Sequence, residues 1–240
     1  MVSGQRILLV AAEPREFAGL LPFCSSVRKV GWPVYWARYG QSGGRQLFMV
    51  ANGAGPVHAG RAVEVAQPEC RPEAIVSMGF CGALDPALSI GDVFVATAVE
   101  AAGRRFEACL PCAGQAGALP HHATGVLASI DHVAQTAAEK NALRATGAAA
   151  VEMEAGGVAE RAAKHGTPLF CVRAVTDTAG ESFVTDFNRA LRSDGHFGTI
   201  SILTSAFGNP GKAFPELLRL RNFCRIASRT LGEFIAGCRF

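Results

Sequence analysis

Short, uninterrupted apolar runs alternate with segments of helical periodicity along this 240-residue chain. Residues 7–12 and 169–172 are such runs, and apolar side chains on both faces are typical of strands buried on both sides. Their alternation with helices predicts an α/β fold in which helices cover a mostly parallel sheet. The predicted strands are 6–12, 34–39, 46–51, 73–78, 92–99, 148–152 and 168–174. The predicted helices are 14–22, 56–67, 136–145, 153–165, 184–192 and 214–236.

Composition excludes several classes of protein. Hydrophobic residues make up 49% of the chain and charged residues 18%, which excludes a disordered chain or a coiled coil. A membrane span needs about 18 consecutive apolar residues, and no window of the sequence supplies them. The N-terminal apolar run passes directly into Glu13 and Arg15, so we interpret it as a buried strand and not as a signal peptide. We therefore expect a soluble, cytoplasmic protein with one domain over residues 1–240.

The net charge of +3 is unevenly placed. Residues 211–240 carry six basic and two acidic side chains, a net +4, so the first 210 residues sum to −1. A near-neutral body with a basic tail does not resemble a nucleic-acid binder. The tail predicts an amphipathic helix at about 214–236, with Arg221, Arg225 and Arg229 along one face. We favour a helix packed on the domain with solvated arginines, and the alternative is weak contact with anionic lipid at the inner membrane face.

The eight cysteines do not require disulfides, because a chain of this length can build a sufficient apolar core. Cys109 and Cys112 have C-x-x-C spacing, and His121 and His122 follow them. A structural zinc site needs four ligands, and a second tight pair is missing. We therefore favour incidental thiols in a long loop at 103–123, a segment whose length is typical of functional lids.

Polar residues follow several predicted strands at the point where each strand ends. Glu16 follows the first strand, a glycine-punctuated turn follows the fourth, and Glu152, Glu154 and Asp177 follow later ones. Each carboxylate alone has an ordinary structural explanation, such as a helix N-terminal acid or an N-cap. Ligands of open α/β sheets, however, bind beyond the carboxyl ends of the strands. A rim of carboxylates there suits cleavage of a sugar–base bond, which needs an acid, a base and a group that holds sugar hydroxyls.

Three motifs in this order resemble the nucleoside phosphorylase and nucleosidase superfamily. They are G-F-C-G-A-L at 79–84 followed by I-G-D-V at 90–93, V-E-M-E-A at 151–155, and R-A-V-T-D at 173–177. The resemblance covers about residues 6–205. It implies a three-layer α/β/α sandwich around a twisted mixed sheet, a purine nucleoside as substrate, no cofactor and no metal. Members commonly form homodimers in which a neighbour completes the 5′ end of the pocket.

The resemblance also implies roles for individual residues. Glu154 would hold the ribose 2′- and 3′-hydroxyls with Met153 packed on the sugar, and Asp177 would donate a proton to purine N7. Val133 and Ala134 lie where family members flank the base, although many relatives have an aromatic residue in place of Val133. The remaining expected substrate contacts are Glu152, Phe80, Cys81, Gly82 and Thr176.

The resemblance separates two reactions by the group that attacks the sugar. Phosphorolytic relatives with this motif carry arginines that bind phosphate, at positions that here are Glu16 and Ser77. Family hydrolases place a glutamate in the first loop as the base for water, and Glu16 fits that role. Arg173 remains and would orient water or bind an anion. We therefore favour hydrolysis, with phosphorolysis as the alternative.

Finer features are similar to the hopanoid-associated branch of the superfamily. They are L-D-P-A-L at 84–88, A-E-K-N-A-L-R at 138–144, D-G at 194–195 and P-E-L-L-R-L at 215–220. That branch is thought to release adenine from adenosylhopane, so the substrate expected here is a 5′-modified purine nucleoside. The alternatives are methylthioadenosine/adenosylhomocysteine nucleosidase, futalosine hydrolase, a purine nucleoside phosphorylase and, outside enzymes, an inert nucleoside-binding protein.

Overall fold

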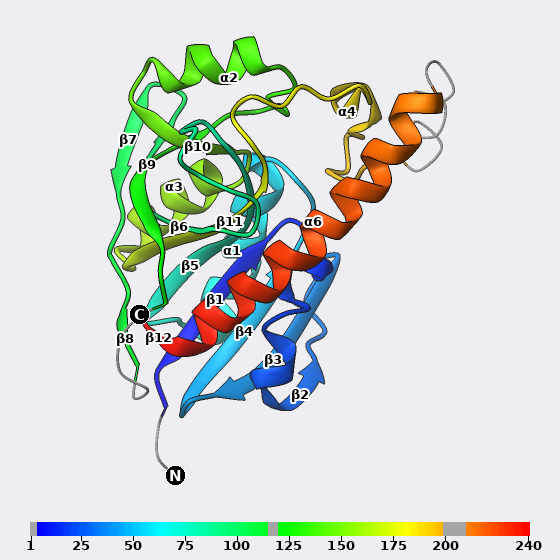
Figure 1. Ribbon diagram of the computed structural model, residues 1–240. Helices are drawn as coiled ribbons and strands as arrows, with labels where there is room; N and C mark the ends of the chain where they lie inside the picture. The colour runs from blue at the N-terminus through cyan, green and yellow to red at the C-terminus, as the bar shows by residue number, and fades with distance from the viewer. Residues whose placement is uncertain (1–3, 115–119, 199–209) are drawn as a thin grey trace.

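The computed structural model describes residues 4–114, 120–198 and 210–240. Its main sheet contains β1 (Arg6–Ala11), β2 (Ser25–Lys29), β3 (Trp36–Ser42), β4 (Arg45–Ala51), β5 (Ala74–Ala83), β6 (Val93–Ala101), β7 (Arg104–Glu107), β9 (Ala123–Ser129), β10 (Ala148–Glu152) and β11 (Leu169–Asp177). The pairing order is β10-β9-β6-β11-β5-β1-β4-β3-β2, with β7 also paired to β6 (Figure 1). A separate pair joins β8 (Cys112–Ala113) to β12 (Cys238–Arg239). The helical elements are η1 (Pro14–Phe17), η2 (Leu21–Phe23), α1 (Pro56–Cys70), α2 (Ala137–Arg144), α3 (Ala155–His165), α4 (Phe187–Ala190) and α6 (Pro210–Gly237).

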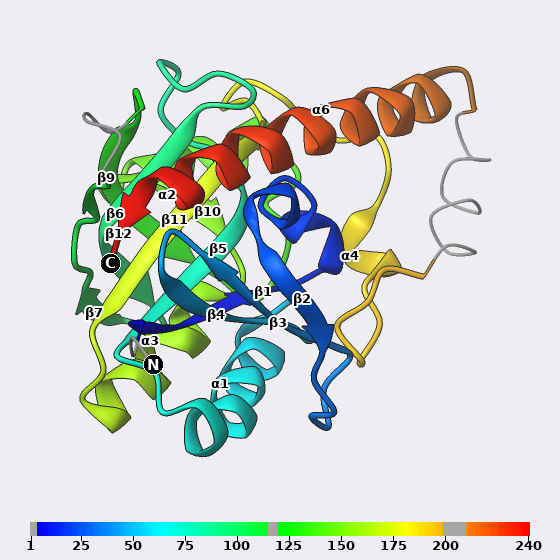
Figure 2. The ribbon, with the colours of Figure 1, turned by 90° about the horizontal axis from the view of Figure 1, so that it is seen from below.

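Helices cover both faces of the sheet, and the alternation of side chains along β1 shows why. Ile7 and Leu9 belong to the core that α6 closes, whereas Leu8 and Val10 belong to the core beneath α1 and α3. All four side chains are fully buried, as expected for a strand enclosed on both sides. Figure 2 shows the resulting layers, with α6 on one side of the sheet and α1 with α3 on the other. The predicted three-layer α/β/α sandwich is confirmed.

The far end of β5 brings two of the sequence motifs together. β5 pairs in parallel with β1 and β11, and its last residues also pair in antiparallel fashion with β10. Through β10, β9, β6 and β11 the pairing path returns to β5. Gly82 consequently lies between Val151 of β10 and Asp177 of β11. This register places the V-E-M-E stretch and Asp177 on either side of Gly82. The glycine turn predicted after residue 78 is wrong, because β5 continues through Ala83.

α6 is anchored against the loop that carries Glu16. Ser228 of α6 donates a hydrogen bond to the carbonyl of Arg15 (2.9 Å) and accepts one from the backbone N–H of Gly19 (3.1 Å). A Cβ on Gly232 would lie 2.0 Å from the carbonyl carbon of Gly19, so only glycine lets the two backbones approach this closely. The basic tail thereby forms one wall beside the first strand–helix loop.

The predicted elements are mostly present, but the strand β9 was not predicted, and several further corrections apply. The sheet is mixed and not mostly parallel, because β3, β7 and part of β10 run antiparallel to their neighbours. The helix expected at 14–22 is replaced by the two 3-10 turns η1 and η2, and the helix expected at 184–192 is shortened to α4. The strand β2 was missed because all of its side chains are exposed, so no apolar run marks it.

The segment 103–123 is not a continuous loop. Ala102 and Gly103 both have positive φ values of 48° and 74°, and they form a two-residue hairpin turn that pairs β7 with β6. β8 follows, and β9 begins at Ala123. Residues 115–119 of this segment lie outside the described residues. Alanine is an uncommon residue at positive φ, so the sequence did not mark the turn.

The approach of α6 to Gly19 predicts a stability effect. Gly232→Ala should destabilise the protein by about 1–3 kcal/mol, because the new methyl group forces two backbones apart. Gly237→Ala is the matched control, since a Cβ there meets nothing within 4 Å. Urea denaturation of both variants measures the effect, and equal stability of the two would contradict the close approach.

Candidate active site

A cavity of about 1150 Å³ opens beside the ends of β1, β5, β10 and β11, between these strands and α6. Its lining includes carboxylates from three separate parts of the chain: Glu16 from η1, Glu154 before α3 and Asp177 at the end of β11. Each of these three side chains is at most 8% exposed. The predicted rim of carboxylates therefore lies around one cavity. Among the sequence-predicted site residues, those that line the cavity are Glu16, Phe80, Cys81, Gly82, Val133, Ala134, Glu152, Met153, Glu154, Thr176 and Asp177.

Glu16 is held by the backbone at the inner end of this cavity. Its Oε2 accepts a hydrogen bond from the N–H of Glu13 (2.8 Å), and its Oε1 accepts one from the N–H of Phe80 (3.0 Å). Burial raises the pKa of Glu16 by more than these hydrogen bonds and the charge of Arg173 lower it, so the pKa is raised overall. A fixed carboxylate with a raised pKa is suited to accept a proton from water.

Gly79 separates Glu16 from Arg173. A Cβ at this position would lie 2.6 Å from Glu16 Oε1 and 2.7 Å from Arg173 Nη1, and the φ of Gly79 is 152°. No other residue would fit between the two charged groups without moving one of them. Glycine is thus required at position 79 of β5, because the carboxylate of Glu16 and the guanidinium of Arg173 both lie close to it.

Arg173 lies beneath the cavity and not on its surface. Its side chain is fully buried, and Nη2 donates hydrogen bonds to Ser77 Oγ (2.7 Å) and to the carboxylate of Glu152. Nε and Nη1 have no hydrogen-bond partner within the described residues. Burial lowers the pKa of Arg173, but the charges of Glu152, Glu154 and Glu16 outweigh it, and the pKa is raised overall. Arg173 therefore stays charged and balances the carboxylates above it.

Glu152 and Glu154 have different surroundings, although they are two residues apart. Glu152 accepts hydrogen bonds from the backbone N–H groups of Glu154 and Ala155 in addition to Arg173, so both of its oxygens are bound within the protein. Glu154 Oε1 accepts a hydrogen bond from the N–H of Gly55 (3.0 Å). Burial, with the nearby charge of Glu152, raises the pKa of Glu154 to about 8. Glu152 thus orients the start of α3, and Glu154 faces the cavity.

Asp177 is the last residue of β11, and no helix among the described residues begins there, so it is not an N-cap. Thr176 Oγ1 donates a hydrogen bond to Asp177 Oδ1 (3.1 Å), and the ammonium of Lys140 from α2 contacts Oδ2. Lys140 Nζ also donates to the carbonyl of Thr178 (2.8 Å). Burial raises the pKa of Asp177 by more than the charge of Lys140 lowers it, so the pKa is raised overall. Sequence reasoning missed Lys140, because a lysine in an amphipathic helix normally faces solvent.

The region where a base is expected contains more aromatic side chains than the sequence indicated. Val133 lines the cavity, and its backbone N–H and C=O are bound by the side chain of Asn188 at 2.7 and 3.0 Å. Phe183 and Phe187 line the same cavity, with ring centroids 5.2 Å apart. These two rings belong to a segment without any recognised motif, so no signal in the sequence identified them.

The N-terminal half of α6 lines the outer part of the cavity. Leu217, Leu220 and Cys224 are half-buried along it, together with the exposed Arg221 and Arg225. The C-terminal half is different, since its side chains Ala227, Leu231 and Phe234 are fully buried in the core. The predicted packing of the helix on the domain therefore holds for its C-terminal half, although Ser228, Arg229 and Glu233 of that half also line the cavity.

Glu13, His196 and Tyr35 were also missed by sequence reasoning. His196 Nδ1 lies 2.9 Å from Glu13 Oε1, and its ring lies against Tyr35 with centroids 4.2 Å apart. His196 is placed by Gly195, whose carbonyl accepts a hydrogen bond from the N–H of Ala54 (2.7 Å). All three side chains line the cavity and extend its polar surface beyond the predicted residues.

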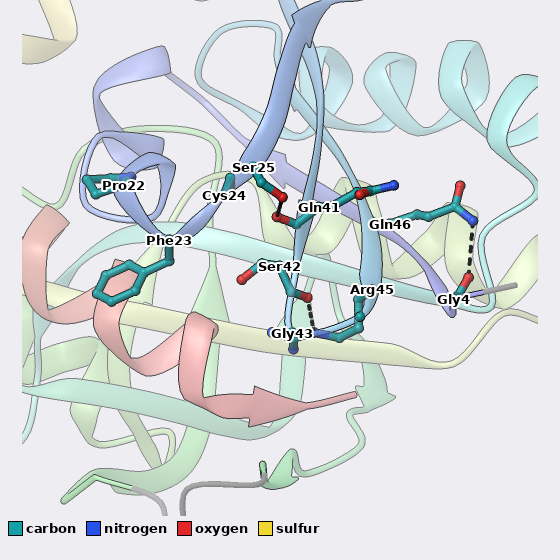
Figure 3. A pocket seen from close by; sticks show the side chains of 11 residues that line it. Gly4, Pro22, Phe23, Cys24, Ser25, Gln41, Ser42, Gly43, Arg45 and Gln46 are labelled. Carbon is teal, nitrogen blue, oxygen red and sulfur yellow. Dashed lines mark hydrogen bonds between the residues drawn. The ribbon is translucent and has the colours of Figure 1, made fainter. Parts of the chain in front are cut away.

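A second cavity, of about 500 Å³, offers no acid or base. Figure 3 shows Arg45 among its lining residues, and none of those residues is a carboxylate or a histidine. The guanidinium of Arg45 is bound to the carbonyls of Ser42 (3.2 Å), Ala236 (3.1 Å) and Cys238. Arg45 therefore stabilises the end of α6 and is not free for a ligand.

Metal binding and membrane spanning find no support in the part of the chain that the structure describes. Cys109 and Cys112 are exposed and free. Within residues 4–114, 120–198 and 210–240, no group of three or more His, Cys, Asp or Glu side chains is placed to hold a metal ion. No helix in these ranges combines the length and the apolar character that a membrane crossing requires.

Comparisons with known proteins give relatives along nearly the whole chain. A 5′-methylthioadenosine/S-adenosylhomocysteine nucleosidase of Marinomonas sp. is 24% identical over 229 residues, which cover 84% of this chain and 98% of the relative. One from Geobacillus thermodenitrificans is 26% identical over 179 residues, which cover 64% of this chain and 76% of the relative.

Solved structures share the fold at lower identity. The nucleosidase of the same description from Neisseria meningitidis, in complex with methylthio-immucillin-A, has a TM-score of 0.72, 20% identity and 97% coverage of both chains. A futalosine hydrolase mutant of Helicobacter pylori has a TM-score of 0.67, 16% identity and 96% coverage of both chains.

The model of the phosphorylase superfamily matches residues 6–196, which span β1 and extend past β11 to His196 at the cavity. This match includes all three motifs and the cavity residues Glu16, Glu154 and Asp177. The chain belongs to the phosphorylase superfamily.

Proposed function

We propose that the protein is a nucleosidase, which hydrolyses the N-ribosidic bond of a purine nucleoside with a modified 5′ carbon. The observation that carries the proposal is the placement of Glu16, Glu154 and Asp177 around one cavity, each in a different hydrogen-bonding environment. The nucleosidase names of the relatives from Marinomonas sp. and Geobacillus thermodenitrificans support it.

Each carboxylate has a role that its surroundings favour. Glu16, held by two backbone N–H groups, accepts the proton of the attacking water. Glu154 binds the sugar hydroxyls through the oxygen that Gly55 leaves free, with Met153 against the sugar. Asp177 donates to N7 of the purine, so that the base leaves neutral. The buried carboxylates stabilise the oxocarbenium-like sugar that forms as the bond breaks.

Other site residues position the substrate in this proposal. Arg173 acts from beneath the cavity, where its guanidinium holds Glu152 of the cavity wall and, through Glu152, the start of α3 in place. Phe183 and Phe187 supply the aromatic contact with the base that Val133 lacks. The remaining contacts come from the backbone and side chains of Phe80, Cys81, Gly82, Ala134 and Thr176.

The same geometry favours water over phosphate as the attacking group. Phosphate binds best to free guanidinium groups, but Arg173 is buried and already paired with Glu152. Ser77 is likewise fully buried and bound to Arg173. The carboxylate of Glu16 at the inner end of the cavity would repel a phosphate dianion. Phosphorolysis remains the alternative reaction.

Substitution of the acid and the base tests the proposal. Asp177→Asn and Glu16→Gln should each lower kcat for base release by about 10²–10⁴-fold, because positioned acid–base groups contribute on that scale. Both variants should still bind the nucleoside, since the cavity keeps its shape. Glu73→Gln, at an exposed carboxylate, is the control. Near-wild-type activity of Asp177→Asn would refute its role as the acid, and absence of base release by the wild type would leave an inert nucleoside-binding protein.

The cavity extends beyond the volume that a nucleoside needs, and its outer part is lined by α6. We propose that a large apolar 5′ substituent lies along Leu217, Leu220 and Cys224, as the triterpenoid of adenosylhopane would. Methylthioadenosine, adenosylhomocysteine and futalosine are the alternative substrates.

Leu220→Asp tests this part of the proposal. It should raise KM for a nucleoside with a long apolar 5′ chain about tenfold or more, because burial of such a contact is worth roughly 1.5–3 kcal/mol. The KM for adenosine should not change. Leu218→Asp is the matched control, since Leu218 is 67% exposed and does not line the cavity. Equal effects of Leu220→Asp on both substrates would exclude a 5′ chain along α6.

Weak contact with the membrane surface is a further part of the proposal. Arg221, Arg225 and Arg229 are exposed at the mouth of the cavity, where they would meet anionic lipid headgroups. Wild-type protein should therefore float with phosphatidylglycerol-containing vesicles, and the triple Arg→Glu variant should not. Equal flotation of the two would exclude this contact. The homodimer and the cytoplasmic location stay predictions, which sedimentation velocity and cell fractionation test.

A further inference from the structure

Lys140 is a buried lysine, and the A-E-K-N-A-L-R motif that contains it gave no role for its side chain. It lies in the middle of α2, whose first turn is fixed by Thr136 Oγ1 accepting a hydrogen bond from the N–H of Glu139 (3.1 Å). Its side chain is 0% exposed, and its ammonium lies 5.3 Å from the ring centroid of Phe183. Burying an ammonium group costs several kcal/mol unless it is paired and hydrogen-bonded. The contacts that offset this cost are with Asp177 and Thr178.

Both oxygens of the Asp177 carboxylate have a partner within the protein. Lys140 contacts Oδ2, Thr176 Oγ1 donates to Oδ1, and a Cβ on Gly82 would lie 2.7 Å from Oδ2. The two side chains therefore form one rigid buried pair at the cavity.

The charged and titratable groups around the pair come from three other elements. Glu181, after β11, raises the pKa of Asp177. Cys81 on β5 and Cys224 on α6 also face Asp177, and burial raises the pKa of both thiols. At neutral pH these thiols are therefore uncharged. The charged group in direct contact with the carboxylate of Asp177 is therefore the ammonium of Lys140.

An ammonium beside the proposed acid presents a chemical problem. The acid must give a proton to the base, and burial raises the pKa of Asp177, but the charge of Lys140 opposes that rise and favours the ionised carboxylate, which has no proton to give. The problem disappears if Lys140 and Asp177 share one proton. In the free protein this proton resides on Lys140, and it passes to Asp177 when N7 of the purine gains electron density as the sugar–base bond breaks.

We propose that Lys140 is a positioning residue that supplies, through Asp177, the proton taken by the departing base. The inference rests on the proposed nucleosidase function and assigns to Lys140 a role in it. Lys140 acts through Asp177 and does not itself contact the substrate.

The protons and electron pairs of the step balance. As the C1′–N9 bond breaks, its electron pair goes to the base, N7 takes the proton of Asp177, and Lys140 Nζ passes its proton to Oδ2. Water forms the new C1′–O bond and gives its proton to Glu16. The protein ends with a neutral Lys140 and a protonated Glu16, and solvent returns that proton to Lys140 after the products leave.

The pH dependence of base release distinguishes this role from a structural one. In Lys140→Met, Asp177 must carry the proton alone, so the active form is its acid form. Activity is then present below the pKa of Asp177 and falls about tenfold per pH unit above it. The wild-type pair keeps its shared proton to higher pH, so its alkaline limb lies higher. A variant with only a packing defect would lose activity by the same factor at every pH.

The experiment measures kcat/KM for base release between pH 5 and 9 with wild type, Lys140→Met and Lys140→Arg. Lys164→Met, at an exposed lysine of α3, is the control. Lys140→Met should be within about tenfold of wild type at pH 5 and at least 100-fold below it at pH 9. Lys140→Arg should lose at least 100-fold at every pH, because arginine keeps the positive charge but does not release a proton. Thermal denaturation of each variant shows that it is folded.

Two results overturn the inference while leaving the proposed function intact. One is a Lys140→Met profile with the wild-type shape, and the other is a Lys140→Arg variant as active as wild type, which also decides the matter if Lys140→Met does not fold. Absence of base release by the wild type at every pH overturns the proposed function and this inference together.

Discussion

The buried guanidinium of Arg173 holds the site together. It binds Ser77 of β5 and Glu152 of β10, and its charge faces Glu16 across Gly79. Without this positive charge, the buried carboxylates Glu16, Glu152 and Glu154 would repel one another, because burial weakens the screening of charges by solvent. The guanidinium thus permits carboxylates to gather beneath the cavity, and its pairing with Glu152 leaves it unavailable as a free phosphate site.

Burial raises the pKa of Glu16, Glu154 and Asp177, but the neighbours that modify this effect differ for each. Glu16 is bound by two backbone N–H groups and is near a positive charge, which oppose the effect of burial. Glu154 has one backbone donor and lies close to Glu152, and its pKa is raised to about 8. Asp177 is paired with an ammonium from a different element. Three side chains of the same chemical kind can therefore act as base, sugar ligand and acid in one cavity.

The sequence was sufficient to predict the positions of the cavity carboxylates. Glu16, Glu154 and Asp177 follow buried strands, and the pairing of β5 with β1, β10 and β11 brings those strand ends together. Short-range patterns were less informative where a long-range contact decides the structure. Lys140 is buried because α2 packs beside β10 and its side chain reaches Asp177 at the end of β11, and nothing in its own helix indicates this.

The basic tail at residues 211–240 is a second case in which a sequence pattern predicts an element but not its contacts. Its periodicity predicted a helix, and α6 is that helix, but periodicity does not reveal which half contacts the core. The close approach of Gly232 to Gly19 fixes the C-terminal half, and one face of the helix between Leu217 and Glu233 then lies beside the cavity. A basic segment that appeared separate from the carboxylates thereby becomes part of the same site.

The choice between water and phosphate is the most direct test of this account. Purine nucleosides with different 5′ substituents, adenosine and methylthioadenosine among them, are incubated with the protein in phosphate buffer, and the products are followed by phosphorus NMR together with free base. We predict free base and free sugar, with no sugar 1-phosphate signal and the same rate in phosphate-free buffer. Accumulation of a sugar 1-phosphate, with base release that depends on phosphate, would contradict the assignment of Glu16 as the base for water.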